Sequence, residues 1–194
     1  MRDAEIKYWD DIAVRGINDN IWKRQEIVRR LLSLPLINQH ILEIGCGGGN
    51  TFGSISAALL WKFDYMGTDL SPSFCATARK VWGLNAVQAD VRSIPYPDNS
   101  ADLVVALDSL EHVRPDDRIP GYREIDRILK PFGRIAINIP LDISGHKDEF
   151  DFGFAERDLF ELLHVCNMRL ETYEQYNVNC GDEWRHYAWA VGVR

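Results

Sequence analysis

An apolar run that breaks into alternating glycines, Ile41 to Asn50, constrains this chain more than any other feature. The segment reads Ile-Leu-Glu-Ile-Gly-Cys-Gly-Gly-Gly-Asn, with glycines at Gly45, Gly47 and Gly49 among others. Glycines at alternate positions permit positive φ angles and remove the Cβ atoms that would keep a ligand away from the backbone. The segment therefore predicts a buried strand that ends in a turn lying close to a bound molecule.

Two acidic residues come next, at the ends of the second and third predicted strands. Asp69 closes the apolar segment 64–69, and Asp90 comes directly after the short strand 85–89. In open α/β sheets a ligand lies at the carboxyl ends of the strands, and an acid after the second strand binds ribose hydroxyls. An acid there, in place of an arginine, also argues against a ligand with a 2′-phosphate.

With the glycine turn and these two acids, the chain resembles the class I S-adenosylmethionine-dependent methyltransferases. Residues 93–105 resemble that family's passage into its fourth strand, and Leu-Glu-His-Val at 110–113 resembles the turn after that strand. Residues 130–138 resemble its entry into the fifth strand. The resemblance covers roughly residues 38–140 and implies S-adenosyl-L-methionine as the methyl donor, with S-adenosyl-L-homocysteine as the product.

The resemblance also implies a role for each residue on the donor side. The glycines would let the backbone approach the methionine part, and Glu43 would hold the turn and contact the amino-acid end. Asp69 would take the two ribose hydroxyls, and Asp90 would accept from the adenine amino group. For Glu43 and Asp90, turn capping is the alternative role. The expected cofactor-binding set is Glu43, Gly45, Cys46, Gly47, Gly49, Asp69, Leu70, Asp90, Val91 and Leu107.

A dinucleotide-binding domain is the competing interpretation of the glycine turn. Its fingerprint is Gly-x-Gly-x-x-Gly, in which the third glycine packs the helix on the strand. Here Gly45, Gly47 and Gly49 are evenly spaced, and Phe52 precedes Gly53. The spacing does not fit, so we set this interpretation aside.

Alternating strand and helix patterns predict one α/β domain over residues 1–194. The resemblance implies a single Rossmann-like, seven-stranded sheet, mostly parallel with an antiparallel last strand and with helices on both faces. Residues 1–33 should form an N-terminal helical lid and 38–140 the cofactor-binding core, with no separate substrate domain. The expected strands are 40–45, 64–69, 85–89, 102–107, 133–139, 169–178 and 184–193, and the expected helices are 3–33 (split near residue 16), 51–61, 72–82, 116–130 and 155–166.

Three side chains are candidates for a catalytic base. Asp108 lies directly after the fourth strand, His112 lies on the same turn, and His146 lies on the polar loop 141–154. A base is needed only when the acceptor holds its proton at neutral pH, and a histidine titrates near neutrality. Turn capping for Asp108 and a structural role for His112 are the alternatives.

Aromatic residues near the N-terminus suggest how the site is covered. Tyr8, Trp9 and Trp22 could shield the cofactor from water, although ordinary packing of an amphipathic helix explains them equally well. The short lid suits a small, polar acceptor, sugar- or amino-acid-like, methylated on oxygen or nitrogen. We expect this acceptor to lie between the N-terminal helices and the loop 141–154.

Composition argues against several classes of partner. The net charge of −7 disfavours nucleic acid, because neutralising phosphates needs clustered lysines and arginines. No apolar run reaches the roughly 18 residues of a membrane span, and the polar start is unlike a secretory signal. The four cysteines include no Cys-x-x-Cys pair, so neither a zinc site nor a disulfide framework is indicated. We expect a cytoplasmic protein that needs no metal; the oligomeric state is not indicated.

Other acceptor classes and a non-catalytic role are the alternatives to a small-molecule enzyme. An enzyme that methylates protein arginine is expected to have two glutamates after the fourth strand, and only Glu111 is present there. Methylation of a base amino group would want an Asn/Asp-Pro-Pro-aromatic turn, whereas the chain has Asp-Ser-Leu-Glu at 108–111. A non-catalytic S-adenosylmethionine-binding regulator or scaffold, or a methyltransferase acting on protein or RNA, stays open as an alternative.

Overall fold

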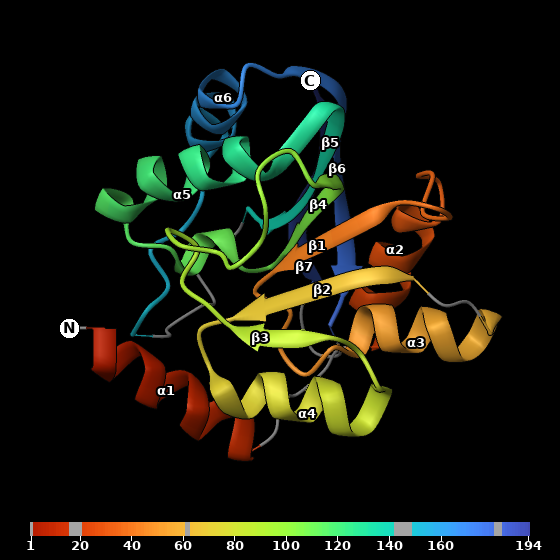
Figure 1. Ribbon diagram of the computed structural model, residues 1–194, viewed down its shortest axis with the longest axis vertical. Helices are drawn as coiled ribbons and strands as arrows, with labels where there is room; N and C mark the ends of the chain where they lie inside the picture. Colours follow the sequence, from red (N-terminus) through yellow and green to blue (C-terminus); the bar gives the residue numbers. More distant parts are fainter. Residues whose placement is uncertain (1, 16–20, 61–62, 142–148, 181–183) are drawn as a thin grey trace.

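Seven strands form one sheet in the order β3-β2-β1-β4-β5-β7-β6 (Figure 1). The computed structural model describes residues 2–15, 21–60, 63–141, 149–180 and 184–194. Strands β1 to β5 pair in parallel, and β7 is antiparallel to both of its neighbours. This topology confirms the predicted fold. The strands are β1 His40–Ile44, β2 Asp64–Asp69, β3 Ala86–Gln88, β4 Ala101–Leu107, β5 Leu129–Pro140, β6 Arg169–Asn179 and β7 Trp184–Val193.

Helices cover both faces of the sheet. Helices α2 and α3 pack on one face, α5 and α6 pack on the other, and α1 lies beside α4 (Figure 1). The predicted break in the N-terminal helical segment falls at residues 16–20, which lie outside the described residues between α1 and α2. The helices are α1 Arg2–Arg15, α2 Ile21–Leu31, α3 Asn50–Leu59, α4 Pro72–Trp82, α5 Pro115–Ile128 and α6 Glu156–Val165, with a 3₁₀ turn η1 at Leu110–His112.

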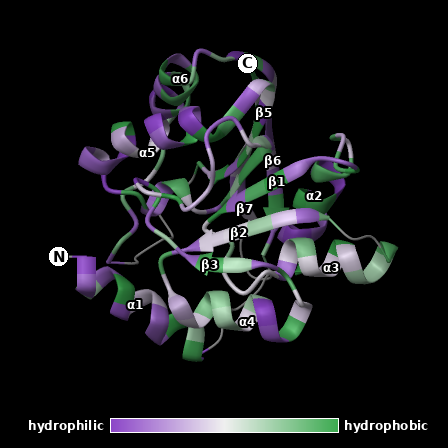
Figure 2. Cartoon of the chain, in the orientation of Figure 1, coloured by the Kyte–Doolittle hydropathy of each residue, from purple (hydrophilic) through white to green (hydrophobic). Residues whose placement is uncertain are grey.

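Alternate residues of the central strands supply the two halves of the core. In β1, Leu42 packs in the cluster with α5 and α6, and Ile41 packs in the cluster with α2 and α3. Strand β4 is buried at every position except Asp102, as expected for a strand covered on both faces. Figure 2 shows the hydrophobic colour gathered on the central strands and the hydrophilic colour on outward helix turns.

Helix α4 begins and ends where the sequence predicts. The hydroxyl of Ser71 accepts a hydrogen bond from the amide of Phe74 at 3.1 Å, and Pro72 occupies the first helical position. Gly83 ends the helix with φ 66°, a left-handed conformation that costs glycine no Cβ clash. The start of α4 therefore holds in place the residues that come directly after Asp69.

Strand β5 departs from the expectation. The sequence predicts a helix that reaches residue 130 and a strand that begins at 133, but α5 ends at Ile128 and β5 begins at Leu129. Leu129 pairs with Ala101 before the register shifts to Leu103 and Arg134, so β5 bulges between the two pairs. Propensity places a proline-glycine segment outside a strand, and pairing with β4 overrides that preference here.

Candidate active site

A cavity of about 390 Å³ opens at the carboxyl ends of β1, β2, β3 and β4. This volume lies within the ~300–1,000 Å³ of ordinary ligand pockets. Side chains of α1 and α2 and the turn after β4 complete its wall. The predicted site residues that line it are Glu43, Gly45, Cys46, Gly47, Asp69, Leu70, Asp90, Val91, Leu107, Asp108 and His112.

The glycine turn approaches the cavity through its backbone. Gly45 and Gly47 have φ of 69° and 51°. A Cβ at Gly45 would lie 2.4 Å from the Cβ of Ser109, whereas one at Gly47 would meet nothing within 4 Å. Gly45 is therefore required by packing against the turn after β4, and Gly47 leaves room for a ligand.

Gly49 lies outside the cavity lining, unlike Gly45 and Gly47. It is the N-cap of α3 with φ 76°, and a Cβ there would lie 2.9 Å from Leu84 and 3.0 Å from Ala78. It is not among the residues that line the cavity, whereas Gly48 is. Gly49 thus allows α3 to pack closely against α4.

Asp69 joins the end of β2 to the glycine turn. Its Oδ2 accepts from the Gly47 amide and its Oδ1 from the Ser71 amide, each at 2.9 Å. Burial raises the pKa of Asp69 to about 6, against the opposing effect of these amides. A carboxylate offers about four lone-pair sites, so each oxygen can still accept a ribose hydroxyl.

Glu43 lies beneath the glycine turn, buried in β1. Its Oε2 accepts from the hydroxyl of Tyr65, and burial raises its pKa to about 8. Glu43 also lines the cavity. This placement is compatible both with the expected contact to the amino-acid end of a donor and with a role in holding the turn.

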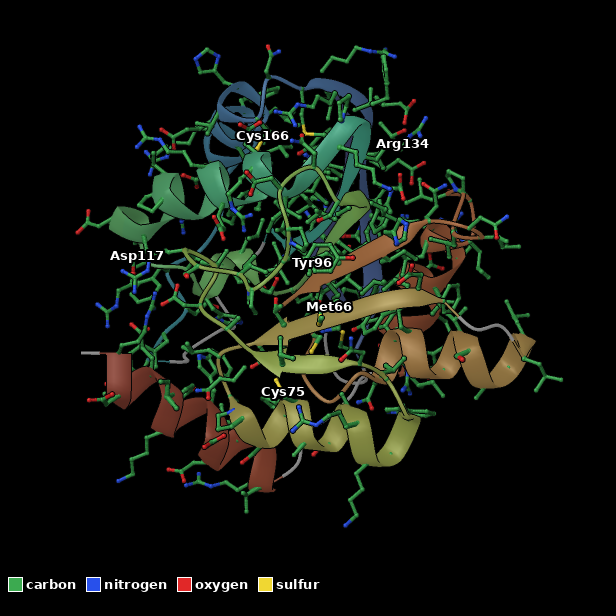
Figure 3. All side chains as sticks on the ribbon, viewed as in Figure 1. Met66, Cys75, Tyr96, Asp117, Arg134 and Cys166 are labelled. Atoms are coloured by element: carbon green, nitrogen blue, oxygen red, sulfur yellow. The ribbon has the colours of Figure 1, made fainter. Side chains whose placement is uncertain are left out.

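Asp90 stands in a network of arginines that the sequence did not reveal. Its carboxylate accepts from Arg92 at 3.0 and 2.8 Å and lies 2.6 Å from Arg2 of α1. Burial opposes its ionisation, but the hydrogen bonds from Arg92 hold the pKa of Asp90 below its usual range. Asp117, at the start of α5 (Figure 3), pairs with both arginines. Asp90 is thus an ionised acceptor already engaged by two cations.

Asp108 is held from two sides. Its Oδ1 accepts from the amide of Asn138 at 2.7 Å, and its Oδ2 pairs with Lys23 of α2 at 2.6 Å. Its φ of 49° is rare for a residue other than glycine. Because both oxygens are engaged, this arrangement opposes the expected role of Asp108 as a base and favours a role in holding α2 over the cavity.

His112 lies on the cavity wall between α1 and the segment before α6. Its Nδ1 is 3.1 Å from the carbonyl oxygen of Phe150, and its ring meets Trp9 edge-on with 4.7 Å between centroids. Trp9 also lines the cavity, as the lid hypothesis requires, whereas Trp22 is 62% exposed. The third candidate base, His146, lies outside the described residues.

Glu111, which the sequence presents only as the single glutamate after the fourth strand, is a buried residue of the cavity wall. It lines the cavity and is 2% exposed, and its Oε2 has no hydrogen-bond partner among the described residues. Burial, and then the like charge of Asp108, raise the pKa of Glu111 well above its ordinary value. Its position beside His112 in the Leu-Glu-His-Val turn is the one sequence signal that pointed to it.

Two acidic side chains of α1, Asp10 and Glu5, bind this helix to the elements around the site. Asp10 accepts from the Ser71 hydroxyl and, at 3.1 Å, from the Ser73 amide at the start of α4. Glu5 is buried and accepts from Arg114, which lies just after η1. These contacts make α1 a wall of the cavity.

Other features of the described chain bear on cofactors and environment. Within those residues, no group of three His, Cys, Asp or Glu side chains could hold a metal ion. None of the described helices is long and apolar enough to cross a membrane. The four cysteines are free thiols, three of them buried.

Comparison with known sequences agrees with this geometry. Residues 42–137 match the family model described as a methyltransferase domain. An O-methyltransferase of Aspergillus sclerotiorum is 31% identical over 142 residues, covering 68% of this chain and 51% of that protein. The ubiquinone/menaquinone biosynthesis C-methyltransferase of Pseudoalteromonas translucida is 27% identical over 141 residues, covering 69% and 54%. The chain spans about half the length of the curated relatives it matches.

Solved structures share the fold at low identity. A chain of the complex between the Trm112 methyltransferase activator of Haloferax volcanii and a methyltransferase superimposes with a TM-score of 0.76 at 19% identity, covering 97% of this chain and 96% of that one. A methyltransferase of Methanosarcina mazei gives 0.69 at 18% identity, covering 85% and 96%.

Proposed function

Because this chain belongs to the class I S-adenosylmethionine-dependent methyltransferases, we propose that it transfers a methyl group from S-adenosylmethionine to an oxygen or nitrogen of a small polar molecule. The proposal depends above all on one observation: a single cavity is lined both by the glycine turn with Asp69 and by Asp108, Glu111 and His112. A donor and an acceptor could therefore meet in one cavity.

The residues present fit the donor. The open backbone at Gly47 leaves room for the methionine part, and Asp69 offers a partly buried carboxylate fixed by two amides. When bound, S-adenosylmethionine supplies a methyl group activated by a sulfonium. Asp90 and Val91 lie after β3 on the same wall, where an adenine ring is expected.

The acceptor would lie on the side formed by α1, α2 and the turn after β4. That part of the wall combines apolar surface from Trp9, Ile12 and Ile27 with the charged pair Lys23–Asp108. A molecule with a hydroxyl or amine on a compact body suits this mixture, and holding it near the methyl group would supply much of the catalysis. A sugar- or amino-acid-like acceptor is the form of this proposal that we favour.

Turnover on a defined panel tests the proposal. The purified chain is incubated with S-adenosylmethionine and sugars, amino acids, phenols, fatty acids, a quinol, a peptide and an RNA, and S-adenosylhomocysteine formation is measured. Asp69→Asn is the donor-site variant, and Asp108→Asn, His112→Asn and His146→Asn test the three predicted bases. We expect turnover on a small hydroxyl or amine compound, and mass spectrometry identifies the methylated atom.

The same panel separates the alternatives. Turnover only on peptide or RNA would support a macromolecular acceptor, and a methyl group on carbon would correct the proposed acceptor atom. Tight donor binding without turnover on any class would favour a non-catalytic regulator or scaffold.

A further inference from the structure

We propose that Glu111 is the general base of the reaction, and that its Oε2 receives the proton of the acceptor hydroxyl or amine. This inference rests on the proposed function. Glu111 lines the cavity and is 2% exposed, and its Oε2 has no hydrogen-bond partner among the described residues. A buried polar atom without a partner is costly, and a polar group of a ligand would satisfy this one.

The neighbouring acids are already engaged. Both oxygens of Asp108 have partners, at 2.7 Å in Asn138 and 2.6 Å in Lys23. Glu5, on α1, is paired with Arg2 and Arg114. Among the described residues, Glu111 Oε2 is the buried carboxylate oxygen that has no hydrogen-bond partner.

The charges around Glu111 set when it can take a proton. Asp108 at the end of β4 and Asp151 before α6 oppose its ionisation, and Lys23 on α2 favours it. His112, on the same turn, has its Nε2 3.9 Å from Glu111 Oε1. Burial and Asp108 raise the pKa of Glu111 well above its usual range, which brings a carboxylate closer to the strength that proton removal at neutral pH requires.

A positively charged donor in the same cavity would shift this balance. An opposite charge favours the ionised form of a carboxyl group, so a sulfonium should draw Glu111 towards the carboxylate before transfer. In the step itself the acceptor atom bonds to the methyl carbon and the carbon–sulfur bond breaks, leaving its electron pair on sulfur. The acceptor proton passes to Glu111 Oε2. Loss of the positive charge then stabilises the protonated acid.

Proton release on binding tests the inference without knowledge of the acceptor. S-adenosylmethionine and S-adenosylhomocysteine share the ribose, adenine and amino-acid groups and differ by the methyl group and its charge. Titration calorimetry in buffers of different ionisation enthalpy, from about pH 5 to 9, counts the protons released by each. Both ligands are measured on the wild type, Glu111→Gln and, as the matched neighbour, His112→Gln.

We expect S-adenosylmethionine to release more protons than S-adenosylhomocysteine from the wild type and from His112→Gln, and the difference to disappear in Glu111→Gln. No difference in the wild type, or a difference that disappears only in His112→Gln, would overturn the inference while leaving the proposed function intact. Failure of both ligands to bind would overturn the proposed function itself. Glu111→Ala serves as the second variant should Glu111→Gln not fold.

Turnover supplies the second readout once an acceptor is known. Loss of a general base lowers turnover by about 10²–10⁴-fold, so Glu111→Gln should fall in that range while donor affinity stays near normal. Turnover of Glu111→Gln equal to the wild type would overturn the assignment.

Discussion

Lys23 Nζ lies 2.6 Å from Asp108 Oδ2, so a side chain of α2 is tied to the end of β4 at the edge of the cavity. The same aspartate accepts from Asn138 at 2.7 Å, and Asn138 in turn accepts from the hydroxyl of Tyr176 at 2.5 Å. The chain of contacts connects α2, β4, β5 and β6. These contacts hold in place the cavity wall against which an acceptor would bind.

Removing one member of this pair should destabilise the fold. Asp108 raises the pKa of Lys23 above its usual range, so Lys23 is charged throughout the neutral range. Lys23→Met leaves Asp108 without its cation and should lower the free energy of unfolding by about 1.5–3 kcal/mol, measured by urea denaturation. In the matched control Arg29→Met, which removes an exposed pair with Glu26 on the same helix, the change should stay below about 1 kcal/mol. A double mutant with Asp108→Asn that shows no coupling would contradict the pair's role.

Donor affinity should depend on pH through Asp69. Burial raises its pKa to about 6, and only the ionised carboxylate accepts fully from two ribose hydroxyls. As pH falls below about 6, affinity for S-adenosylhomocysteine should therefore weaken by up to about tenfold per pH unit, measured by calorimetry. Asp69→Asn should bind weakly at every pH and lose this dependence. The control Asp64→Asn, at the exposed start of β2, should behave like the wild type.

The features that could be predicted from the sequence are those that depend on residues close together in the chain. Ser71, Pro72 and Gly83 set the ends of α4 through capping and backbone preference, and these act within a few residues. The position of Asp69 is predictable for a similar reason. It ends the strand that follows the glycine turn in the chain, and in a parallel α/β sheet the end of that strand lies beside the turn.

The features that the sequence did not reveal depend on contacts between distant segments. Lys23 and Asp108 lie far apart in the chain, and nothing local to either residue announces the pair. Arg2 beside Asp90 is of the same kind. The sequence understates Glu111 because its significance is burial without a partner, which arises only after η1 and α1 close around it.

Two glycines of the turn should respond differently to alanine. Gly45→Ala places a Cβ 2.4 Å from Ser109 and should destabilise the fold by more than the roughly 1–2 kcal/mol that left-handed φ alone costs. In Gly47→Ala the new Cβ would have no atom within 4 Å, so the fold should lose stability only through the left-handed φ. The Cβ would occupy space beside the bound donor, so donor affinity should also fall. Thermal unfolding and calorimetry of both variants separate the effects. If adding Ser109→Gly to Gly45→Ala partly restores the stability of the fold, the clash with Ser109 is the cause of the destabilisation.

Turnover should not depend on a metal ion. Among the described residues no three potential ligands gather, and Asp108 is occupied by Lys23 and Asn138. Dialysis against a chelator should leave turnover on the confirmed acceptor unchanged. Activity that is lost on chelation and restored by magnesium would show this prediction to be wrong.

The pH dependence of stability should reveal the unpaired acid at Glu111. Because burial and Asp108 raise its pKa in the folded state, the folded chain binds this proton more tightly than the unfolded chain, whose value is about 4.3. Stability from this group is therefore lost as pH rises above about 4.3. Glu111→Gln cannot ionise, so relative to the wild type it should gain about 1–3 kcal/mol between pH 4 and pH 8. Glu124→Gln is the control of opposite sign, since Arg127 lowers the pKa of Glu124 and its carboxylate stabilises the fold at neutral pH. Equal pH profiles for the wild type and Glu111→Gln in urea denaturation would mean that Glu111 finds a partner in solution.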